Sequence, residues 1–478
     1  MAAWRMMDGY EMVIGLEVHV ELKTKTKIFC SCETTFGAEP NTQCCPVCMG
    51  FPGTLPVLNQ QVVHYAVLAG LATGCQIARY SKQDRKNYFY PDLPKAYQIS
   101  QYDLPLCIGG HLEVETPEGA KTIGITRIHI EEDAGKLVHD PEKGTLIDCN
   151  RCGVPLIEIV SEPDIRTPQE AVAYLQKLKA VIAYTGVSDC KMNEGSLRCD
   201  VNLSIHKPGE PFGTRTEMKN LNSFQSVQRA IEEEYRRQVE AVRKGETIVQ
   251  ETRRFDQQTG KTTAMRRKEN ANDYRYFPDP DLAPIVLAPD LVEKWGKELP
   301  KLPDERKASY IREYGLTSYA AEQLVSDKAL ADYFETAAQY TPAVKTLANL
   351  MITEVFRLLE GESTLIPIAP AHLAKIAAMA EENVINSGAA KKMVAALWLK
   401  DEDPEAYAER EHLRQINDPA VLAAYVEEAV SAHPDMVESY RKGKVNLKKA
   451  LMGAAMGLSG GMANPVLLQK LMDEKLDG

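Results

Sequence analysis

Apolar and polar residues alternate along several short segments in the first 290 residues of the chain. Alternation predicts β-strands, because successive side chains of a strand point to opposite faces of a sheet. The segments are residues 12–22, 122–132, 156–160 and 201–206. Two longer segments have helical spacing. One runs from the predicted N-cap Thr167 to a stop at Gly186, and the other covers about residues 224–244.

The pattern changes near residue 291, where the chain becomes rich in Ala and Leu at helical spacing. A second change falls in the polar stretch 401–412, which carries Pro404 between two helical patterns. The length of 478 residues agrees with about three domains of roughly 150 residues each. We therefore predict an α+β fold, with a mixed α/β domain at 1–292, an all-helical domain at 293–408 and a small helical tail domain at 409–478.

Composition and charge narrow the class of protein. The 56 basic and 67 acidic residues give a net charge of −11, and the 44% hydrophobic content is typical of globular proteins. No stretch approaches the roughly 18 apolar residues of a membrane span, and the first residues do not have a signal-peptide pattern. We expect a cytoplasmic protein without membrane contact. Its acidic charge disfavours diffuse binding to nucleic acid, so any RNA contact should be local.

Polar side chains share one face of the first predicted strand, GLEVHVEL. Two of them, Glu17 and His19, could bind one divalent cation if carboxylates from neighbouring strands converged there. Glu158 lies in the apolar run PLIEIV, where a buried carboxylate needs a partner. Glu131, Glu132 and Asp133 in RIHIEEDAGK are further candidates. Oxygen and imidazole ligands favour Mg²⁺ or Mn²⁺, and the alternative is a polar sheet face that contacts water.

All eleven cysteines lie in the first 199 residues. Their odd number, without a secretory signal, argues against a disulfide framework. Two close pairs have the spacing of a structural zinc site with four thiolate ligands. The pairs are Cys30-x-Cys32 and Cys45-x-x-Cys48. Cys44 could replace one ligand. Two alternatives stay open, namely a pairing that uses Cys149 and Cys152, and buried free thiols.

The sequence contains no Gly-rich phosphate loop, dinucleotide fingerprint or protein-kinase motif. ATP phosphates could instead contact polar residues of the segments RCDVNLSI and TRTEMKN, as phosphoryl transfer requires charged groups beside a metal. The candidates are Asp200, Asn202, Arg215, Glu217 and Lys219. On spacing alone, an ordinary polar strand face explains these residues equally well.

Residues 251–281 combine basic side chains with aromatic rings. Tyr274, Arg275 and Tyr276 could stack exposed bases and hold phosphates, as the single-stranded end of an RNA requires. An irregular loop held by salt bridges is the simpler interpretation of the same composition. The segment is therefore a candidate RNA contact.

Eight blocks of sequence, taken in order, resemble the B subunits of bacterial aspartyl/glutamyl-tRNA amidotransferases, and the resemblance covers the whole chain. The blocks are GLEVHVEL, CPVCMGFPGTLPVLN, KNYFYPDLPKAYQISQYDLPL, RIHIEEDAGK, VPLIEIVSEPDIRTPQEA, EGSLRCDVNLSI, TRTEMKNLNSF and NDYRYFPDPDL. The resemblance implies that the first predicted domain is cradle-shaped and catalytic, and that a helical domain and a tail domain follow it.

Proteins of this family take part in the ATP-dependent amidation of misacylated Glu-tRNA(Gln) and Asp-tRNA(Asn). The resemblance implies that this chain binds the tRNA and phosphorylates the aminoacyl carboxylate. It also implies two partner proteins, a glutaminase (the A subunit) that supplies ammonia and a small third protein (the C subunit). Ammonia would then displace phosphate from the acyl phosphate and form the amide.

The resemblance also implies roles for individual residues. The Mg²⁺ or Mn²⁺ ion would be held by Glu17, His19, Glu132 and Glu158, and the catalytic residues would be Glu131, Glu132 and Lys219. Strict alternation places Glu131, not Glu132, beside His129. Glu132 could therefore reach the ion only through a bulge or at a strand end.

Two further implications concern zinc and tRNA. The family pattern does not require Cys149 or Cys152, which favours the two close pairs as the zinc ligands. The family tail is thought to touch the tRNA body through basic residues, but Gly460 and Met462 occupy that turn in this chain. Phosphate contacts would then fall to basic residues upstream. These are Arg441, Lys442, Lys444, Lys448 and Lys449, which could equally form a solvated helix face.

Two other functions fit parts of the sequence. The chain could be a zinc-stabilised tRNA-binding scaffold whose catalytic carboxylates belong to a partner. It could also be an RNA-binding protein with a structural zinc and no reaction, but that function leaves the buried Glu158 unexplained. Amide formation from free ammonium and ATP would distinguish an enzyme from a scaffold.

Overall fold

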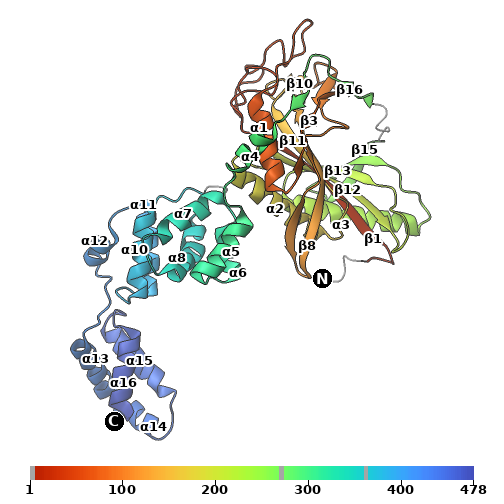
Figure 1. The fold of residues 1–478 in the computed structure, drawn as a ribbon. Coiled ribbons are helices and arrows are strands. Elements are labelled where there is room, and N and C mark those ends of the chain that lie inside the picture. Colours follow the sequence, from red (N-terminus) through yellow and green to blue (C-terminus); the bar gives the residue numbers. More distant parts are fainter. Residues whose placement is uncertain (1–5, 268–273, 360–363, 478) are drawn as a thin grey trace. The chain divides into compact units, whose positions relative to one another are not determined.

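The computed structural model describes residues 6–267, 274–359 and 364–477. The chain divides into two compact units, Met1–Leu302 and Pro303–Gly478 (Figure 1). The first unit is mixed α/β and the second is helical, as the sequence predicts. Among the described residues, no helix combines the length and the apolar character that crossing a membrane requires.

A ten-stranded sheet forms the centre of the first unit, in the order β15-β14-β13-β12-β1-β11-β8-β6-β2, and β7 also pairs with β8. The strands are β1 (Glu11–Glu21), β2 (Gln76–Ile77), β6 (Cys107–Ile108), β7 (His111–Thr116), β8 (Gly119–Glu132), β11 (Pro155–Ser161), β12 (Leu197–His206), β13 (Thr216–Leu221), β14 (Glu251–Asp256) and β15 (Lys261–Arg267). The four alternating segments predicted from the sequence are the antiparallel neighbours β8, β11, β1 and β12.

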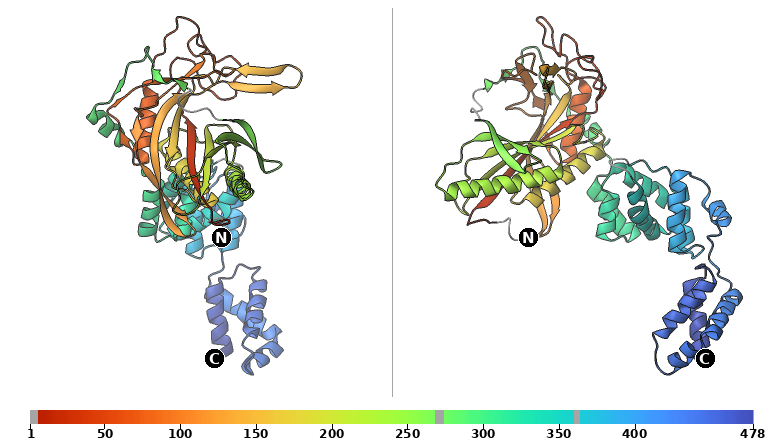
Figure 2. Two further views of the ribbon diagram at one scale, coloured as in Figure 1. Left: turned by 90° about the vertical axis from the view of Figure 1, so that its right-hand side faces the viewer. Right: turned by 180° about the vertical axis from the view of Figure 1, so that it is seen from behind.

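Helices cover the apolar face of this sheet. They are α1 (Gln60–Ala72), α2 (Pro168–Thr185) and α3 (Phe224–Arg243). Figure 2 shows α2 and α3 crossing the same face. The Thr167 hydroxyl accepts a hydrogen bond from the Glu170 amide at the start of α2, and Gly186 ends the helix at a positive φ of 75°. Both predicted helices are confirmed. Leu16 and Val18 of β1 pack into the core beneath them.

Smaller sheets lie beside the large one. One has the order β16 (Phe277–Pro278), β4 (Asp84–Asn87), β5 (Tyr97–Ser100), and β5 packs against β8. The others are the hairpin of β9 (Lys136–Asp140) and β10 (Gly144–Asp148), and the pair β3 (Tyr80–Ser81) and β17 (Ile285–Val286). The Arg85 guanidinium donates to Asp279 at 2.8 Å, which fastens the segment around residue 279 to β4.

The first unit ends at Leu302, ten residues later than the predicted boundary at 292. The extra residues include the end of α4 (Pro289–Gly296). Trp295, Leu299 and Leu302 pack against the core of the first unit, and the Trp295 ring lies 4.7 Å from the ring of His64 on α1. Apolar burial therefore joins this segment to the sheet domain, although its helical spacing resembles that of the following helices.

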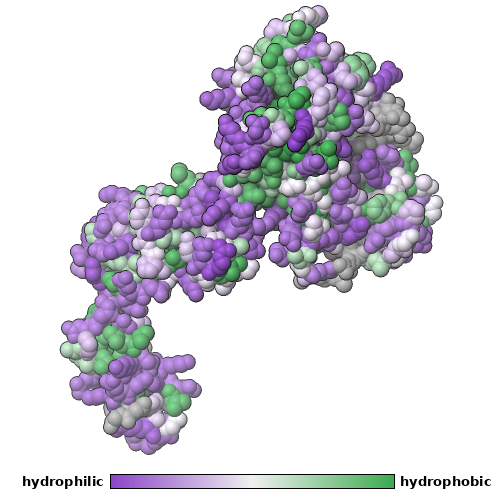
Figure 3. All heavy atoms as spheres, viewed as in Figure 1, coloured by the Kyte–Doolittle hydropathy of each residue, from purple (hydrophilic) through white to green (hydrophobic). Residues whose placement is uncertain are grey.

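The second unit contains two hydrophobic cores, one between Tyr310 and Leu413 and the other between Leu422 and Leu476. Its helices are α5 (Pro303–Tyr314), α6 (Ser318–Leu324), α7 (Lys328–Ala338), α8 (Val344–Leu350), the π-helix η3 (Met351–Val355), α9 (Phe356–Leu358), α10 (Pro370–Glu381), α11 (Ser387–Leu399), α12 (Pro404–Arg410), α13 (Pro419–Ala432), α14 (Pro434–Arg441), α15 (Leu447–Leu458) and α16 (Pro465–Asp477). Much of the face of this unit visible in Figure 3 is hydrophilic.

The position of the boundary can be tested with two fragments. We expect residues 1–302 to unfold at a higher urea concentration than residues 1–292, because the longer fragment keeps apolar contacts worth about 3 kcal/mol in total. Circular dichroism during urea titration measures the two midpoints. Equal midpoints would contradict the assignment of residues 293–302 to the first unit.

Candidate active site

Polar residues of four neighbouring strands form a row across the face of the large sheet that lies opposite the apolar core. The antiparallel register aligns His19 on β1 with Glu158 on β11, and Glu158 with His129 on β8. On the other side of β1, His19 is aligned with Arg198 on β12. Side chains that alternate along each strand thus meet across strands, because aligned residues of neighbouring strands lie about 5 Å apart.

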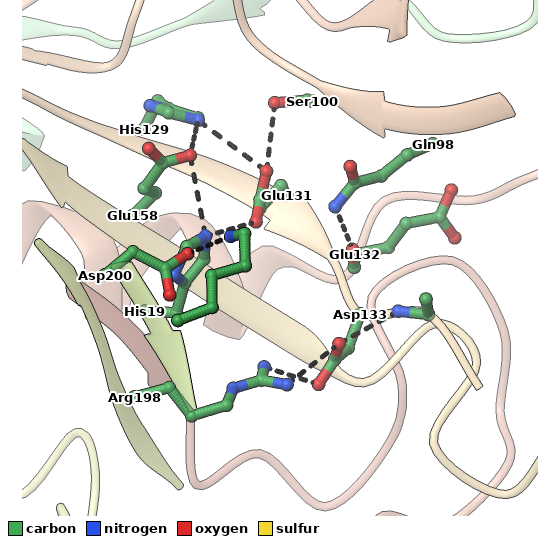
Figure 4. A network of polar contacts seen from close by, with 12 residues as sticks. His19, Gln98, Ser100, His129, Glu131, Glu132, Asp133, Glu158, Arg198 and Asp200 are labelled. Atoms are coloured by element: carbon green, nitrogen blue, oxygen red, sulfur yellow. Dashed lines mark hydrogen bonds and ion pairs between the residues drawn. The ribbon is translucent and has the colours of Figure 1, made fainter. Parts of the chain in front are cut away.

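His19, His129, Glu131 and Glu158 converge in what we call the histidine–carboxylate cluster (Figure 4). The His19 Nε2 atom lies 3.5 Å from Glu131 Oε1 and 3.7 Å from Glu158 Oε2. The His129 Nε2 atom lies 3.2 Å from Glu158 Oε2 and 3.7 Å from Glu131 Oε2. One ligand atom from each of His19, Glu131 and Glu158 lies within 4.8 Å of the other two, so the three side chains could bind one metal ion.

Burial makes the charges of this cluster strongly interdependent. Only 3% of His129, 3% of Glu131 and 9% of Glu158 is exposed. Burial alone would lower the pKa of His129, but the Glu158 charge and hydrogen bonds to both carboxylates raise it to about 9. Burial likewise opposes ionisation of Glu158, yet the neighbouring imidazoles hold its pKa well below the usual value. The site therefore favours two buried carboxylates balanced by positive charge.

Glu132 lies apart from this cluster. Residues Glu131 and Glu132 pair in regular register with Leu156 and Pro155, so no bulge turns Glu132 toward the other acids. Its Oε1 atom accepts a hydrogen bond from the Ile99 amide at 2.8 Å and pairs with Lys95. The structure thus brings Glu131, and not the expected Glu132, to His19, because adjacent residues of a strand face opposite sides.

The Glu132 side chain instead borders a cavity of about 210 Å³. The lining residues include Lys27, Cys30, Cys48, Lys95 and Gly153. The cavity therefore lies between the end of β8 and the cysteine-bearing loop.

Glu17 belongs to a second group on the same sheet face, with Asp200 and Glu217, which we call the acidic cluster. Its Oε1 atom accepts a hydrogen bond from Asn202 Nδ2 at 2.9 Å. Lys219 pairs with Asp200, and its Nζ lies 3.3 Å from Glu217 Oε1. Four of the five residues predicted to contact ATP are thus brought together, whereas Arg215 lies exposed before β13. Glu17 is placed here rather than in the group of His19.

Lys86 on β4 was not predicted from the sequence. Its Nζ lies 5.0 Å from the ring centre of Tyr274 and 5.9 Å from that of Tyr88. Burial would lower the pKa of Lys86, but Tyr276, Glu131 and Glu158 raise it well above the usual value. β4 has only four residues and no alternation, so the one available signal is a lysine followed by three aromatic residues in RKNYFY.

The aromatic residues predicted to stack RNA bases pack against other side chains. The Tyr276 ring stacks on Tyr102 with 4.4 Å between ring centres, and Tyr274 contacts Tyr88 edge to face. Burial raises the pKa of Tyr276 to about 12. Arg275 follows Tyr274 at a positive φ of 46°. These rings therefore form part of the wall next to Lys86.

The ion pair between Arg198 and Asp133 is a second feature that the sequence does not predict. The Arg198 guanidinium donates to both Asp133 oxygens, at 2.6 and 3.3 Å, and Arg151 Nε lies 3.4 Å from the same carboxylate. Burial opposes ionisation of Asp133, but the two guanidinium groups hold its pKa below the usual value. This bidentate pair ties the end of β8 to β12 across two intervening strands.

The four predicted zinc ligands are close together. The sulfur atoms of four residues all lie within 4.8 Å of one another, and these residues are Cys30, Cys32, Cys45 and Cys48. Lys27 is fully buried, and its Nζ lies 3.5 Å from the Cys48 sulfur. A hydrogen bond from Cys30 lowers the pKa of Cys48 to about 4. Four thiols, one of them readily ionised beside a lysine, could hold a zinc ion.

The other cysteines of that region are not members of this group. Cys149 and Cys152 are buried nearby, and Cys44 is partly exposed. The carbonyl of Cys149 accepts a hydrogen bond from Lys27 Nζ at 3.4 Å. Within the part of the chain that the structure describes, the geometry favours the two close pairs over the alternative ligands.

The basic residues proposed for tRNA binding lie in the second unit. Arg441 ends α14, and Lys442 and Lys444 follow it with exposed side chains. Lys442 pairs with Glu438 at 2.5 Å, one helical turn earlier. Such an exposed pair contributes little to stability, so these residues are accessible to a partner.

Comparisons with known proteins agree over nearly the whole chain. Residues 12–293 match the family model described as the GatB/GatE catalytic domain, and residues 332–476 match the model described as the GatB domain. A Caldicellulosiruptor saccharolyticus protein, named as the B subunit of an aspartyl/glutamyl-tRNA(Asn/Gln) amidotransferase, is 54% identical over 476 residues, which is 98% of this chain and 99% of that protein. A protein of the same name from Geotalea uraniireducens is 50% identical over 477 residues, which is 98% of this chain and 100% of the relative.

The placement of the two adjacent glutamates can be tested by metal binding. We expect Glu131→Gln to weaken Mn²⁺ binding at the histidine–carboxylate cluster on the order of tenfold or more, because it removes a ligand and a charge. Glu132→Gln is the matched control, and it should leave Mn²⁺ binding unchanged. Electron paramagnetic resonance of free Mn²⁺ during titration measures both. Equal loss in the two variants would contradict the placement.

Proposed function

The chain belongs to the family of aspartyl/glutamyl-tRNA(Asn/Gln) amidotransferase B subunits, and from this premise we propose that its sheet face activates the carboxylate of a misacylated tRNA. The enzyme amidates Glu-tRNA(Gln) or Asp-tRNA(Asn), and this chain performs the ATP-dependent step. The observation that carries the proposal is the convergence of His19, Glu131 and Glu158 from three strands. We further propose that the first unit is the cradle of this family.

Activation is needed because a carboxylate is a poor electrophile. A carboxylate oxygen attacks the γ-phosphorus of ATP, a new oxygen–phosphorus bond forms, and the bond to the ADP oxygen breaks. Ammonia then attacks the acyl carbon of the acyl phosphate and releases inorganic phosphate, which leaves the amide on the tRNA. Catalysis of phosphoryl transfer depends mainly on positioning and on stabilising the charge of the phosphoryl oxygens.

The residues of the sheet face fit these tasks. His19, Glu131 and Glu158 would hold Mg²⁺ or Mn²⁺, and such an ion would neutralise charge on phosphate oxygens. His129 contacts both glutamates from the neighbouring position, and it keeps them oriented toward His19. Lys219 lies among acids on the next strands, where an ammonium group can contact a phosphate.

The other proposed ATP contacts follow from the same face. Asp200, Asn202 and Glu217 line the side of β1 that faces away from β11. Arg215 is exposed beside them, and its long side chain suits a phosphate at the edge of the site. ATP would thus lie across β1, with its terminal phosphate toward His19.

Partners complete the reaction. The glutaminase (the A subunit) supplies the ammonia and the small C subunit joins the complex, as in the family that the chain belongs to. The tRNA contacts the wall formed by Tyr274, Arg275 and Tyr276 near the site, and the basic residues Arg441 and Lys444 of the second unit contact its phosphates.

We propose that the four-cysteine group binds zinc as a structural ion. The zinc would fix the loop that borders the cavity beside Glu132, and four thiolates around Zn²⁺ would leave a net negative charge that Lys27 balances in part. The burial of the lysine ammonium next to Cys48 supports this role, because an unpaired buried charge is costly.

Zinc content tests the ligand set. We expect Cys48→Ser to lose the stoichiometric zinc of the purified chain and to unfold at a lower temperature, because metal binding contributes to folding. Cys44→Ser is the matched control, since this neighbour lies outside the group. Metal analysis by mass spectrometry and thermal unfolding measure both effects. Retention of zinc in Cys48→Ser would contradict the assignment.

The activation step is tested by isotope transfer in the complete amidotransferase with ammonium as nitrogen donor. Glu-tRNA(Gln) labelled with ¹⁸O in its side-chain carboxylate should pass one ¹⁸O atom to inorganic phosphate for each amide formed. Glu158→Gln should reduce amide formation at least 100-fold, on the order expected for loss of a metal ligand, and should leave tRNA binding unchanged. The exposed Glu113→Gln on β7 is the control.

Two outcomes would contradict the proposal. Transfer of the label to AMP would show adenylylation instead of phosphorylation. Undiminished amide formation by Glu158→Gln would show that the catalytic acids belong to a partner protein, as a pure tRNA-binding scaffold requires.

A further inference from the structure

We propose that Cys149 and Cys152 are a modification site, at which hydrogen peroxide forms a reversible disulfide that fixes the turn carrying Arg151. Both cysteines lie outside the four-cysteine group, and both are free thiols in the structure. The inference does not depend on the proposed function, because the bond is detected without amide formation.

The backbone brings the two cysteines together. They are the first and last residues of a reverse turn, in which the Cys152 amide donates to the Cys149 carbonyl at 3.0 Å. The Cα atoms at the ends of such a turn are less than about 7 Å apart. Disulfides join residues whose Cα atoms are roughly 4.4–6.8 Å apart. The backbone of this pair therefore needs little change to accept a disulfide.

The two side chains are also neighbours. Burial and the adjacent Cys149 thiol, which shares a hydrogen bond with Cys152, raise the pKa of Cys152 above its usual value. Cys149 is 6% exposed and Cys152 is 3% exposed. A small oxidant such as hydrogen peroxide suits thiols with so little exposed surface. An oxidised sulfur formed at Cys149 would then have the Cys152 thiol as its nearest reaction partner.

Contacts on two sides hold the thiols in place before any reaction. The Cys149 amide donates to Asn41 Oδ1 at 2.7 Å, and the Cys152 thiol donates to the Asp92 carbonyl at 3.7 Å. The Cys152 sulfur also packs on Gly135, where an added Cβ atom would lie only 3.1 Å from it. Because these contacts already order the turn, closing the bond costs little further conformational entropy.

Arg151 connects the turn to the end of β8. Its Nε donates to the Ala134 carbonyl at 3.0 Å, and Nη2 donates to the Gly135 carbonyl at 2.7 Å. The same guanidinium lies 3.4 Å from Asp133, which Arg198 also contacts (Figure 4). A covalent bond across the turn restricts the backbone of Arg151, and it would therefore keep this guanidinium on Asp133.

The reaction balances with hydrogen peroxide as the oxidant. Cys149, the more exposed thiol, attacks one peroxide oxygen, so that a sulfur–oxygen bond forms and the oxygen–oxygen bond breaks. The departing hydroxide takes the thiol proton and leaves as water, and a sulfenic acid remains. Cys152 then attacks the sulfenic sulfur, forms the disulfide and releases a second water. Two thiols are oxidised and one peroxide is reduced, and an added dithiol reverses the bond by exchange.

Peptide mapping tests the inference on the full-length chain. The chain is treated with one equivalent of hydrogen peroxide, and its free thiols are then alkylated under denaturing conditions. Trypsin cuts after Arg151, so a bond between the two cysteines leaves residues 144–151 and 152–166 joined. We expect mass spectrometry to find the joined peptides in most molecules, and a dithiol added after digestion should separate them.

Two variants identify the pair. Cys152→Ser should give no joined peptides, and its Cys149 should oxidise further to sulfinic acid, because no second thiol captures the sulfenic acid. Cys44→Ser is the matched control, since this partly exposed neighbour lies outside the pair, and it should form the joined peptides as the unmodified chain does. The unmodified chain alone suffices if Cys152→Ser fails to fold.

Hydrogen–deuterium exchange tests whether the bond fixes the turn. The amides of Cys152 and Val154 donate within the turn, to the carbonyls of Cys149 and Arg151. Their exchange should slow several-fold in the oxidised chain and return to the original rate after reduction, because local opening exposes these amides. The Cys152→Ser variant should show no such change on treatment with peroxide.

Three results would overturn the inference. Alkylation of both cysteines in the peroxide-treated chain would show that they do not react. A bond from either cysteine to Cys48 would show that the reactive pair is a different one. Joined peptides with unchanged amide exchange would retain the disulfide but contradict its effect on the turn.

Discussion

The register of four antiparallel strands is the constraint on which the rest of this structure depends. Because β8, β11, β1 and β12 pair as they do, His129, Glu158, His19 and Arg198 form one continuous row. A shift of a single residue in any strand would turn its acids into the apolar core, since side chains alternate between the two faces. Packing of the opposite face on α2 and α3 therefore fixes the register and, with it, the position of every charge in the site.

The buried acids in turn determine what surrounds them. Carboxylates that have left water need nearby positive charge or hydrogen-bond donors, and each of the buried acids in and beside this row has such a neighbour. Glu158 and Glu131 contact the two imidazoles, Asp133 contacts Arg198, and Glu132 on the reverse side pairs with Lys95. The small sheet that carries Lys86 and the loop with the four cysteines lie against β8 and complete the walls of this region. Under the proposed function, this arrangement would let metal, phosphate and carboxylate chemistry take place on a sheet without a phosphate-binding loop.

Much of this arrangement could be predicted from local sequence. Alternation in GLEVHVEL identifies β1 and the face of Glu17 and His19, and a glutamate within PLIEIV identifies a buried acid. The caps at Thr167 and Gly186 fix α2, because a side-chain acceptor and a left-handed glycine are local requirements.

Other features depend on pairing between distant strands, which local sequence does not contain. Glu17 and His19 look equivalent on one strand, yet they meet different neighbours, β12 and β11, so that they fall into different clusters. Glu131, and not Glu132, reaches His19 because β8 continues in regular register to its last residue. Lys86 lies on a strand of only four residues in which apolar and polar residues do not alternate. Trp295 lies in a helix whose pattern of apolar residues does not indicate which hydrophobic core it joins.

The central claim is that strands far apart in sequence deliver His19, Glu131 and Glu158 to one metal ion. Anomalous X-ray diffraction at the manganese absorption edge, from crystals soaked in Mn²⁺, tests this claim most directly. We expect a strong anomalous peak bonded to His19 Nε2 and to oxygen atoms of both glutamates. Manganese peaks found elsewhere on the first unit, with none at these three side chains, would contradict it.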